Sequence, residues 1–228
     1  MPVLGSLATL TTLHWHNEKY DTILLMLSEL VTNPILFFVW AFSLIIAVTI
    51  HEFAHAFIAD KLGDPTPSLQ GRVTLNPIAH LDPVGTIMLL LFRFGWGKPV
   101  PFDPFNLRHP KRDSALIALA GPASNLILAT LLSIAAKLSG SPLLILFSTP
   151  LIMMNINLAI FNLLPVPPLD GSKILYGLLP MDWADEYNDF MSSYGQILLI
   201  LLILPIGGTS IAINLILPVI NLLTNLLL

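Results

Sequence analysis

The stretch PILFFVWAFSLIIAVTI-HEFAH-AFIA, residues 34–59, decides how the rest of the chain is interpreted. It is almost continuously apolar except for His51, Glu52 and His55. Residues i and i+4 share one face of a helix, so His51 and His55 can offer two imidazole nitrogens to one zinc ion. Glu52 stands beside them, close enough to act on a water molecule without being a ligand. This is the HExxH pattern of zinc hydrolases, and such groups in a spanning helix are costly unless they have a partner or a function.

The composition is that of an integral membrane protein. The chain has 228 residues, of which 55% are apolar and only 11% are charged, with a mean hydropathy of +0.80. Soluble domains carry about 25% charged residues. Cysteine is absent, so any metal must be held by histidine and carboxylate groups. The net charge of -4 and the lack of a basic patch predict no nucleic-acid partner, and the N-terminus does not resemble a cleavable signal peptide.

The apolar segments predict an all-α fold, a polytopic transmembrane helix bundle. Asn33 and Pro34 are typical of a helix start, and Gly63-Asp64-Pro65 ends that helix near residue 62. Further spans are expected at residues 114–138 and 142–164, and scaffold helices at residues 194–206 and 210–228. We expect an N-terminal segment at the membrane interface (residues 1–32), a catalytic core (33–180) and a C-terminal scaffold (181–228).

Two shorter segments between the first two spans are expected to lie near the site. Residues 85–94 (GTIMLLLFRF) offer only about ten mostly apolar residues and include Arg93. This length is too short for an upright span, which predicts a re-entrant or half-buried segment. Residues 71–75 (GRVTL) alternate and are partly β-branched, which predicts a short strand. An unwound substrate segment can pair with the edge of such a strand.

The basic residues predict the orientation. Seven of the ten lysines and arginines lie between the HExxH helix and the next full span. Cytoplasmic loops are enriched in these residues, so this loop is expected to be cytoplasmic, with the motif toward that end of its helix. The expected location is the inner membrane of a prokaryotic cell.

A metal held by His51 and His55 needs at least one more protein ligand. Asp170 is the best candidate, because it follows the proline-rich turn PVPP (residues 165–168), whose backbone must be irregular and therefore covered by protein or a water-filled cavity. His80 and Asp82 are the rival candidates, with a loop histidine and a helix cap as the alternative interpretation.

Two asparagines in the apolar segments are candidates for substrate binding. Asn162 lies about two turns before Asp170 and can hold the substrate backbone or an oxyanion. The alternative, a hydrogen bond between helices, stays open. Asn125, in the stretch GPASN (residues 121–125), needs a partner in the membrane interior and is the second candidate.

Together, HEFAH (51–55), GPASN (121–125) and NLLPVPPLDG (162–171) resemble the site-2 proteases of peptidase family M50, zinc metalloproteases that cut within membranes. The resemblance is to the compact prokaryotic branch without PDZ or CBS domains. It implies that His51, His55 and Asp170 bind Zn²⁺, that Glu52 is the catalytic base, and that Asn162 positions the substrate.

The expected function is therefore intramembrane zinc proteolysis of a transmembrane protein or peptide in the lipid bilayer. The alternative is a membrane metal-ion transporter, which should show polar residues along a whole crossing path and repeated halves. The sequence instead concentrates its polar groups at one depth and shows no internal repeat. A catalytically inactive scaffold is disfavoured by the intact Glu52.

Overall fold

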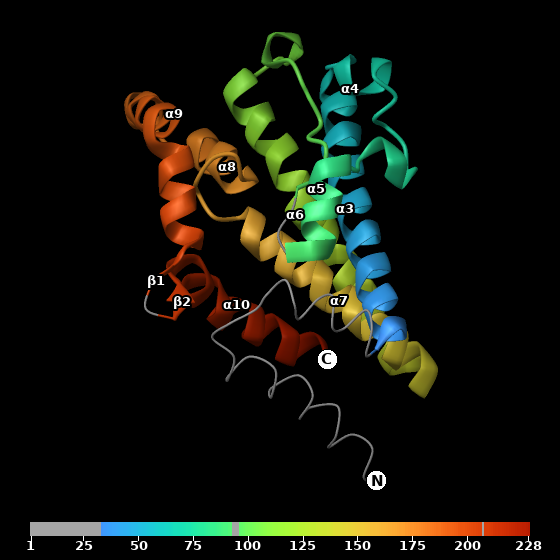
Figure 1. Cartoon of the computed structure of the whole chain (residues 1–228). Coiled ribbons are helices and arrows are strands. Elements are labelled where there is room, and N and C mark those ends of the chain that lie inside the picture. The colour runs from blue at the N-terminus through green and yellow to red at the C-terminus, as the bar shows by residue number, and fades with distance from the viewer. Residues whose placement is uncertain (1–32, 93–95, 207) are drawn as a thin grey trace.

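The computed structural model describes residues 33–92, 96–206 and 208–228, and the backbone of these residues is mostly helical. In this part of the chain, three helices are long and apolar enough to cross a membrane: α3 (Pro34–Leu62), α6 (Pro110–Ser139) and α7 (Pro142–Asn162). All three pack against one another (Figure 1). The prediction of an all-α transmembrane bundle is confirmed, whereas the interfacial segment expected at residues 1–32 lies outside the described residues.

The α3 helix begins and ends where its sequence provides caps. The side chain of Asn33 accepts a hydrogen bond from the Leu36 N–H at 3.3 Å, and Pro34 occupies the first helical position. Gly63 ends the helix with a φ of 107°, a left-handed conformation that favours glycine. The helix is apolar on all sides, so hydrophobicity alone does not select which face is buried.

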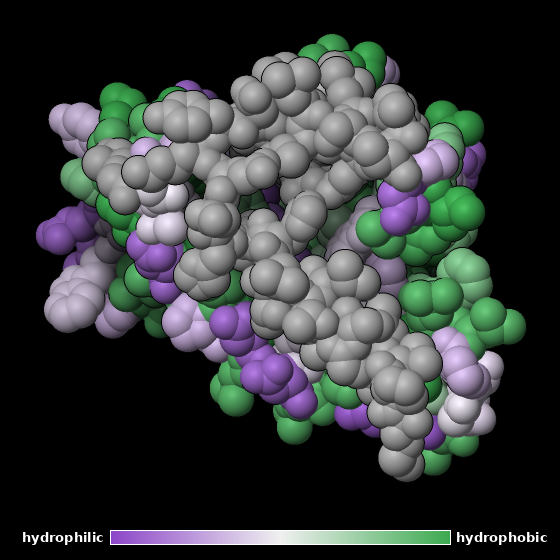
Figure 2. Space-filling model, turned by 60° about the horizontal axis from the view of Figure 1, so that its bottom comes forward, coloured by the Kyte–Doolittle hydropathy of each residue, from purple (hydrophilic) through white to green (hydrophobic). Residues whose placement is uncertain are grey.

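Small side chains select that face. Ala47, Ala56 and Ala59 of α3 are completely buried, and Gly121 of α6 is buried opposite them. Small residues let two helix backbones approach closely in a membrane. Larger apolar side chains stay exposed on the outer faces, and Figure 2 shows many of the hydrophobic residues in green around the edge of the view, interspersed with hydrophilic ones in purple. This distribution is expected for a surface that lipid covers.

The connection between α3 and α6 is compact and carries four short helical segments. These are α4 (Thr66–Leu69), η1 (Pro77–Ala79), α5 (Pro83–Phe92) and η2 (Pro104–Asn106). The ten residues of α5 make a helix of about 15 Å, half the thickness of a bilayer core, as expected for a half-buried segment.

The strand predicted at residues 71–75 is not formed. Local turns use its backbone groups instead: the Arg72 N–H donates to Pro67 O at 2.8 Å, and the Thr74 N–H donates to Arg72 O at 2.9 Å. The prediction was therefore wrong, because five alternating residues are too few to resist turn formation next to Gly71, whose φ is 67°.

After α7 the chain makes the irregular turn predicted from its prolines and enters α8 (Asp170–Leu178). Gly171 packs directly on the carbonyl oxygens of Leu163 and Leu164, and a Cβ atom there would collide with both. The next helix, α9 (Met181–Ile203), starts earlier than expected, because the acidic residues 181–189 form its first turns. A short antiparallel pair, β1 (Pro205–Ile206) and β2 (Thr209–Ser210), leads to α10 (Ile211–Leu227).

The α9 helix supports this turn from the side of the bundle away from α3 (Figure 1). The hydroxyl of Tyr187 donates to Pro165 O at 2.8 Å. Gly195 faces Pro167 so closely that an added Cβ atom would lie 3.0 Å from its Cδ. The proline-rich turn that sets the position of Asp170 is thus braced by a separate helix.

Candidate metal centre

His51 and His55 both lie on the buried face of α3, one helical turn apart. Their side chains are 5% and 10% exposed, and their ring centroids are 4.6 Å apart with nearly perpendicular planes. Each Nδ1 atom faces a carbonyl oxygen: Asn125 Oδ1 at 2.6 Å from His51, and Ile117 O at 2.7 Å from His55. Carbonyl oxygens only accept hydrogen bonds, so both Nδ1 atoms carry the proton. In the neutral form of each ring, Nε2 is therefore left with a free lone pair.

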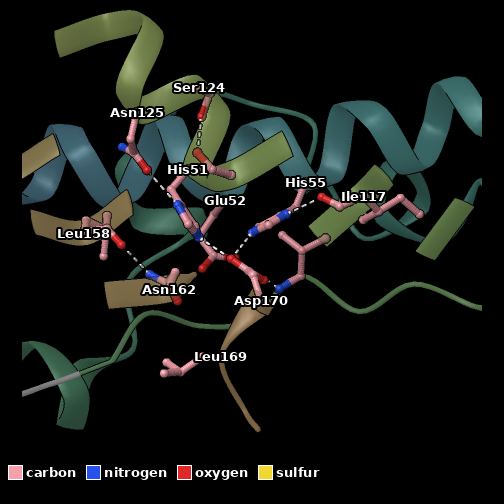
Figure 3. A network of polar contacts seen from close by, with 12 residues as sticks. His51, Glu52, His55, Ile117, Ser124, Asn125, Leu158, Asn162, Leu169 and Asp170 are labelled. Carbon is pink, nitrogen blue, oxygen red and sulfur yellow. Dashed lines mark hydrogen bonds and ion pairs between the residues drawn. The ribbon is translucent and has the colours of Figure 1, made fainter. Parts of the chain in front are cut away.

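Asp170, the first residue of α8, completes the group from the opposite side (Figure 3). Its Oδ2 atom lies 3.0 Å from His51 Nε2 and 3.2 Å from His55 Nε2. Burial alone would raise the pKa of Asp170. When no metal is bound, a proton on Nε2 of the histidines supplies a hydrogen bond and a positive charge, which outweigh burial and hold the pKa of Asp170 well below the usual range of a carboxyl group. Asp170 is therefore in the carboxylate form, which binds metals.

The donor atoms of these three residues fit a zinc ion. One ligand atom from each of His51, His55 and Asp170 lies within 4.8 Å of the others. Two imidazole lone pairs and a carboxylate oxygen converging on one point repel each other unless a cation or a proton lies between them. Two histidines and one carboxylate, with a fourth position left for water, are a ligand set of catalytic zinc sites.

Glu52 lies beside this group and does not belong to it. It lines the same cavity, which has a volume of about 120 Å³ and is also lined by Asn162 and Lys173. Its Oε2 atom accepts a hydrogen bond from the Val100 N–H at 3.2 Å. One carboxylate oxygen is thus held by the backbone, and the side chain borders the space where a substrate would meet the metal.

Val100 belongs to an extended segment, residues 97–103, that we call the covering segment because it forms one wall of the cavity. Near its start, Arg72 donates to Lys98 O, and Lys98 N–H donates to His80 O at 2.8 Å. Burial lowers the pKa of Arg72, and the negative charge of Glu52 opposes that change. The guanidinium group of Arg72 thus both holds the covering segment and places a positive charge near Glu52.

The far end of the covering segment is fastened by Asp64, which is completely buried just after α3. Its carboxylate accepts hydrogen bonds from Asp103 N–H at 2.7 Å, Asn106 Nδ2 at 2.8 Å and the Thr66 hydroxyl at 2.6 Å. Burial would raise the pKa of Asp64, but these hydrogen bonds outweigh it and lower the pKa. The residues directly after the helix that carries the histidines therefore hold one wall of the cavity in place.

Comparison with known proteins agrees with this geometry. A family model described as "Peptidase family M50" matches residues 137–204, which contain α7, the proline-rich turn and Asp170. The protein named "Putative zinc metalloprotease YwhC" from Bacillus subtilis (strain 168) is 43% identical over 177 residues, covering 73% of this chain and 80% of that relative. The chain belongs to peptidase family M50. It is a membrane zinc metalloprotease, and its cofactor is Zn²⁺.

Two further relatives of this M50 protease carry related names. "Putative zinc metalloprotease Rip2" from Mycolicibacterium smegmatis is 31% identical over 184 residues, covering 74% of this chain and 70% of that protein. "Zinc metalloprotease MJ0392" from Methanocaldococcus jannaschii is 28% identical over 156 residues, covering 66% of this chain and 37% of that protein. No solved structure matches the chain.

The structure places the rival ligands of the M50 protease away from the metal group. His80 is completely buried, and its Nε2 atom faces Thr74 O at 2.7 Å. Asp82 accepts the Gly85 N–H at 2.7 Å and so caps α5. Neither residue belongs to the group formed by His51, His55 and Asp170.

The two asparagines predicted to bind substrate have different positions. Asn162 lines the cavity, and its Nδ2 donates to Leu158 O of its own helix at 2.9 Å rather than to another helix. Asn125 is completely buried behind His51, and its amide group is used by His51, Ala47 and Asn155. The expected contact of Asn125 with substrate is thus replaced by a contact with a ligand candidate.

Gly121, in the GPASN stretch, has a role that the sequence did not reveal. An added Cβ atom would lie 2.7 Å from His51 Cε1 and would also collide with the ring of His55. The signal in the sequence was a glycine in the interior of a predicted helix, which usually marks a close approach. The contact of Val100 with Glu52 had no sequence signal, since it joins residues 48 positions apart.

Proposed function

We propose that this protease hydrolyses peptide bonds within, or at the cytoplasmic edge of, membrane-spanning segments of other membrane proteins, as in regulated intramembrane proteolysis. His51, His55 and Asp170 would hold the zinc ion, and Glu52 would be the general acid and base. The observation that carries the proposal is the convergence of these groups inside a spanning helix and its neighbours.

The depth of the site supports a substrate in the membrane. His51 is the eighteenth residue of the 29-residue helix α3, so it lies about 26 Å from the start and about 16 Å from the end of that helix. A hydrocarbon core about 30 Å thick and centred on this helix would contain the ligands, which supports a site at membrane depth rather than in an aqueous loop. The basic connection after α3 supports an orientation with this end toward the cytoplasm of a prokaryotic cell.

The residues around the cavity have distinct tasks in this proposal. When bound, zinc supplies Lewis-acid polarisation of the peptide carbonyl and of water. Glu52, held by the Val100 N–H, removes a proton from the attacking water and returns it to the leaving amine. Asn162 has a second amide N–H beyond the one donated to Leu158, and this group can bind the substrate carbonyl or the oxyanion.

The positions of the residues that line the cavity and of those that brace the turn support a catalytic unit at residues 33–180 and a scaffold at residues 181–228. The cavity is lined by residues of the first unit, among those that the structure describes. The scaffold acts through Tyr187 and Gly195, which brace the turn before Asp170.

Peptide bonds in a helix are shielded by their own hydrogen bonds, so the substrate must unwind locally beside the covering segment.

Reconstituted protein tests the proposal against metal transport. We expect liposomes containing the protein to cleave a single-pass helical substrate, with the cut mapped by mass spectrometry to the cytoplasmic half or edge of its span. A zinc-sensitive dye in the same liposomes should report no protein-dependent zinc flux. Zinc flux without cleavage would support the transporter instead, and cuts confined to aqueous loops would contradict a substrate site in the membrane.

A further inference from the structure

Behind His51, a chain of hydrogen bonds crosses three helices. His51 Nδ1 contacts Asn125 Oδ1 at 2.6 Å, Asn125 Nδ2 donates to Asn155 Oδ1 at 2.7 Å, and Asn155 Nδ2 donates to Leu151 O at 2.7 Å. Both asparagines are completely buried. The first of these contacts is drawn in Figure 3, where Asn125 lies on the side of His51 away from Asp170.

Leu151 O, at the far end of this series of hydrogen bonds, sets the direction of every bond in it. Leu151 O is a carbonyl oxygen and only accepts, so the amide of Asn155 must turn its Nδ2 toward it and its Oδ1 toward Asn125. Asn125 must then present Nδ2 to that oxygen and, at 2.9 Å, to Ala47 O. Its Oδ1 is left facing His51, whose Nδ1 must therefore carry the proton.

We propose that Asn155 is a positioning residue for the metal centre: it fixes the amide of Asn125 and, through it, the tautomer and orientation of His51 that leave Nε2 free for zinc. The inference rests on the proposed role of His51 as a zinc ligand. A partner on the second ring nitrogen is a common requirement of metal-binding histidines.

His55 shows why His51 needs this chain. The Nδ1 atom of His55 donates directly to a backbone carbonyl, Ile117 O, which cannot rotate and offers no donor. His51 instead meets a side-chain amide, which can present either an acceptor or a donor after a rotation of 180°. The acceptors on Asn155 and Ala47 remove that freedom. A buried asparagine within the apolar helix α7 is costly unless its hydrogen bonds are made. Here the hydrogen bonds of Asn155 connect it through Asn125 to His51.

Asn155→Leu keeps the branched shape and the number of heavy atoms but removes the acceptor for Asn125. One N–H of Asn125 then loses its partner, and only Ala47 O still opposes a rotation of the amide. That rotation would present a donor to His51 and favour the tautomer with the proton on Nε2. We expect zinc affinity to fall about 10–100-fold, the range found when such outer partners are removed. Asn155→Asp should stay within a few-fold of wild type, because a neutral buried carboxyl group still offers one acceptor and one donor.

The experiment measures zinc dissociation constants of detergent-purified full chains by competition with a chelating dye, together with ¹⁵N shifts of labelled histidine in zinc-free protein. Asn157→Leu, two residues along the same helix and only half-buried, is the matched control and should bind zinc as wild type does. We expect only Asn155→Leu to weaken zinc binding and to move the His51 proton to Nε2.

Each other outcome overturns the inference. Wild-type affinity in a folded Asn155→Leu protein, equal losses in Asn155→Leu and Asn157→Leu, or an equal loss in Asn155→Asp would mean that Asn155 acts by packing or not at all. If Asn155→Leu does not fold, Asn155→Ser, which is too short to reach Asn125, takes its place with the same expected loss. Wild-type zinc affinity in His51→Ala would instead refute the proposed ligand set, so the two failures are distinguishable.

Discussion

Gly121→Ala is the smallest change that should disable the metal centre without touching a ligand. The new Cβ atom would lie 2.7 Å from His51 Cε1 and would overlap the ring of His55. Carbon atoms in ordinary contact are about 3.5–4.0 Å apart, so the imidazoles or the α6 backbone must move by roughly 1 Å. Overpacking of this kind costs about 1–3 kcal/mol of the free energy of unfolding.

The effect on activity should be larger than the effect on stability. A displacement of about 1 Å at a catalytic site can reduce the rate about 10²-fold. We therefore expect Gly121→Ala to cleave a single-pass helical substrate in liposomes about 10²-fold more slowly than wild type, with a lower zinc content by elemental analysis.

Leu119→Met is the control for this prediction, because Leu119 lies on the same helix and is 42% exposed. This variant should keep wild-type activity, zinc content and thermal stability. If Gly121→Ala also behaves like wild type in all three measurements, the imidazoles do not pack against α6 at Gly121, and the geometry of the site described above is refuted.

Three further predictions concern the ligand candidates, the residue that holds the far end of the covering segment, and the proline-rich turn. Asp170→Ala should lose zinc binding, and full zinc occupancy in this variant would remove Asp170 as a ligand. The pKa of Asp64 is lower in the folded protein than the ordinary carboxyl value of 3.8, so its contribution to stability is present above that value and is lost as the pH falls through the folded pKa. Asp64→Asn should therefore flatten the acid side of a plot of the free energy of unfolding against pH. An unchanged acid side would contradict this prediction. Tyr187→Phe should lower the free energy of unfolding by about 0.5–1.5 kcal/mol and weaken zinc binding, because the hydroxyl braces the turn that positions Asp170. Unchanged zinc affinity would show that this hydrogen bond does not position Asp170.

The parts of the fold that could be predicted are those set by local sequence. The caps at Asn33 and Gly63 fixed α3, and the spacing of His51 and His55 placed both rings on one face. Three prolines before Asp170 forced an irregular turn, and the choice of Asp170 as the third ligand candidate agrees with the observed group.

The parts that could not be predicted depend on partners distant in sequence. A buried amide such as Asn125 is expected to need partners, but nothing local says that one of them is His51, 74 residues away. The covering segment is held by Arg72 and Asp64, whose charges look like ordinary loop polarity in the sequence. The early start of α9 was missed because its acidic residues resemble a loop, although they form the polar turns of an amphipathic helix.

Glu52→Gln tests the central claim most directly. Glutamine keeps the size of the side chain but cannot accept a proton, and the three ligand candidates remain, so the zinc content should equal that of wild type. General acid–base catalysis contributes about 10²–10⁴-fold, so cleavage of a single-pass helical substrate in liposomes should fall by at least that order. A Glu52→Gln protein that binds zinc and cleaves at the wild-type rate would contradict the assignment of Glu52 as the catalytic base.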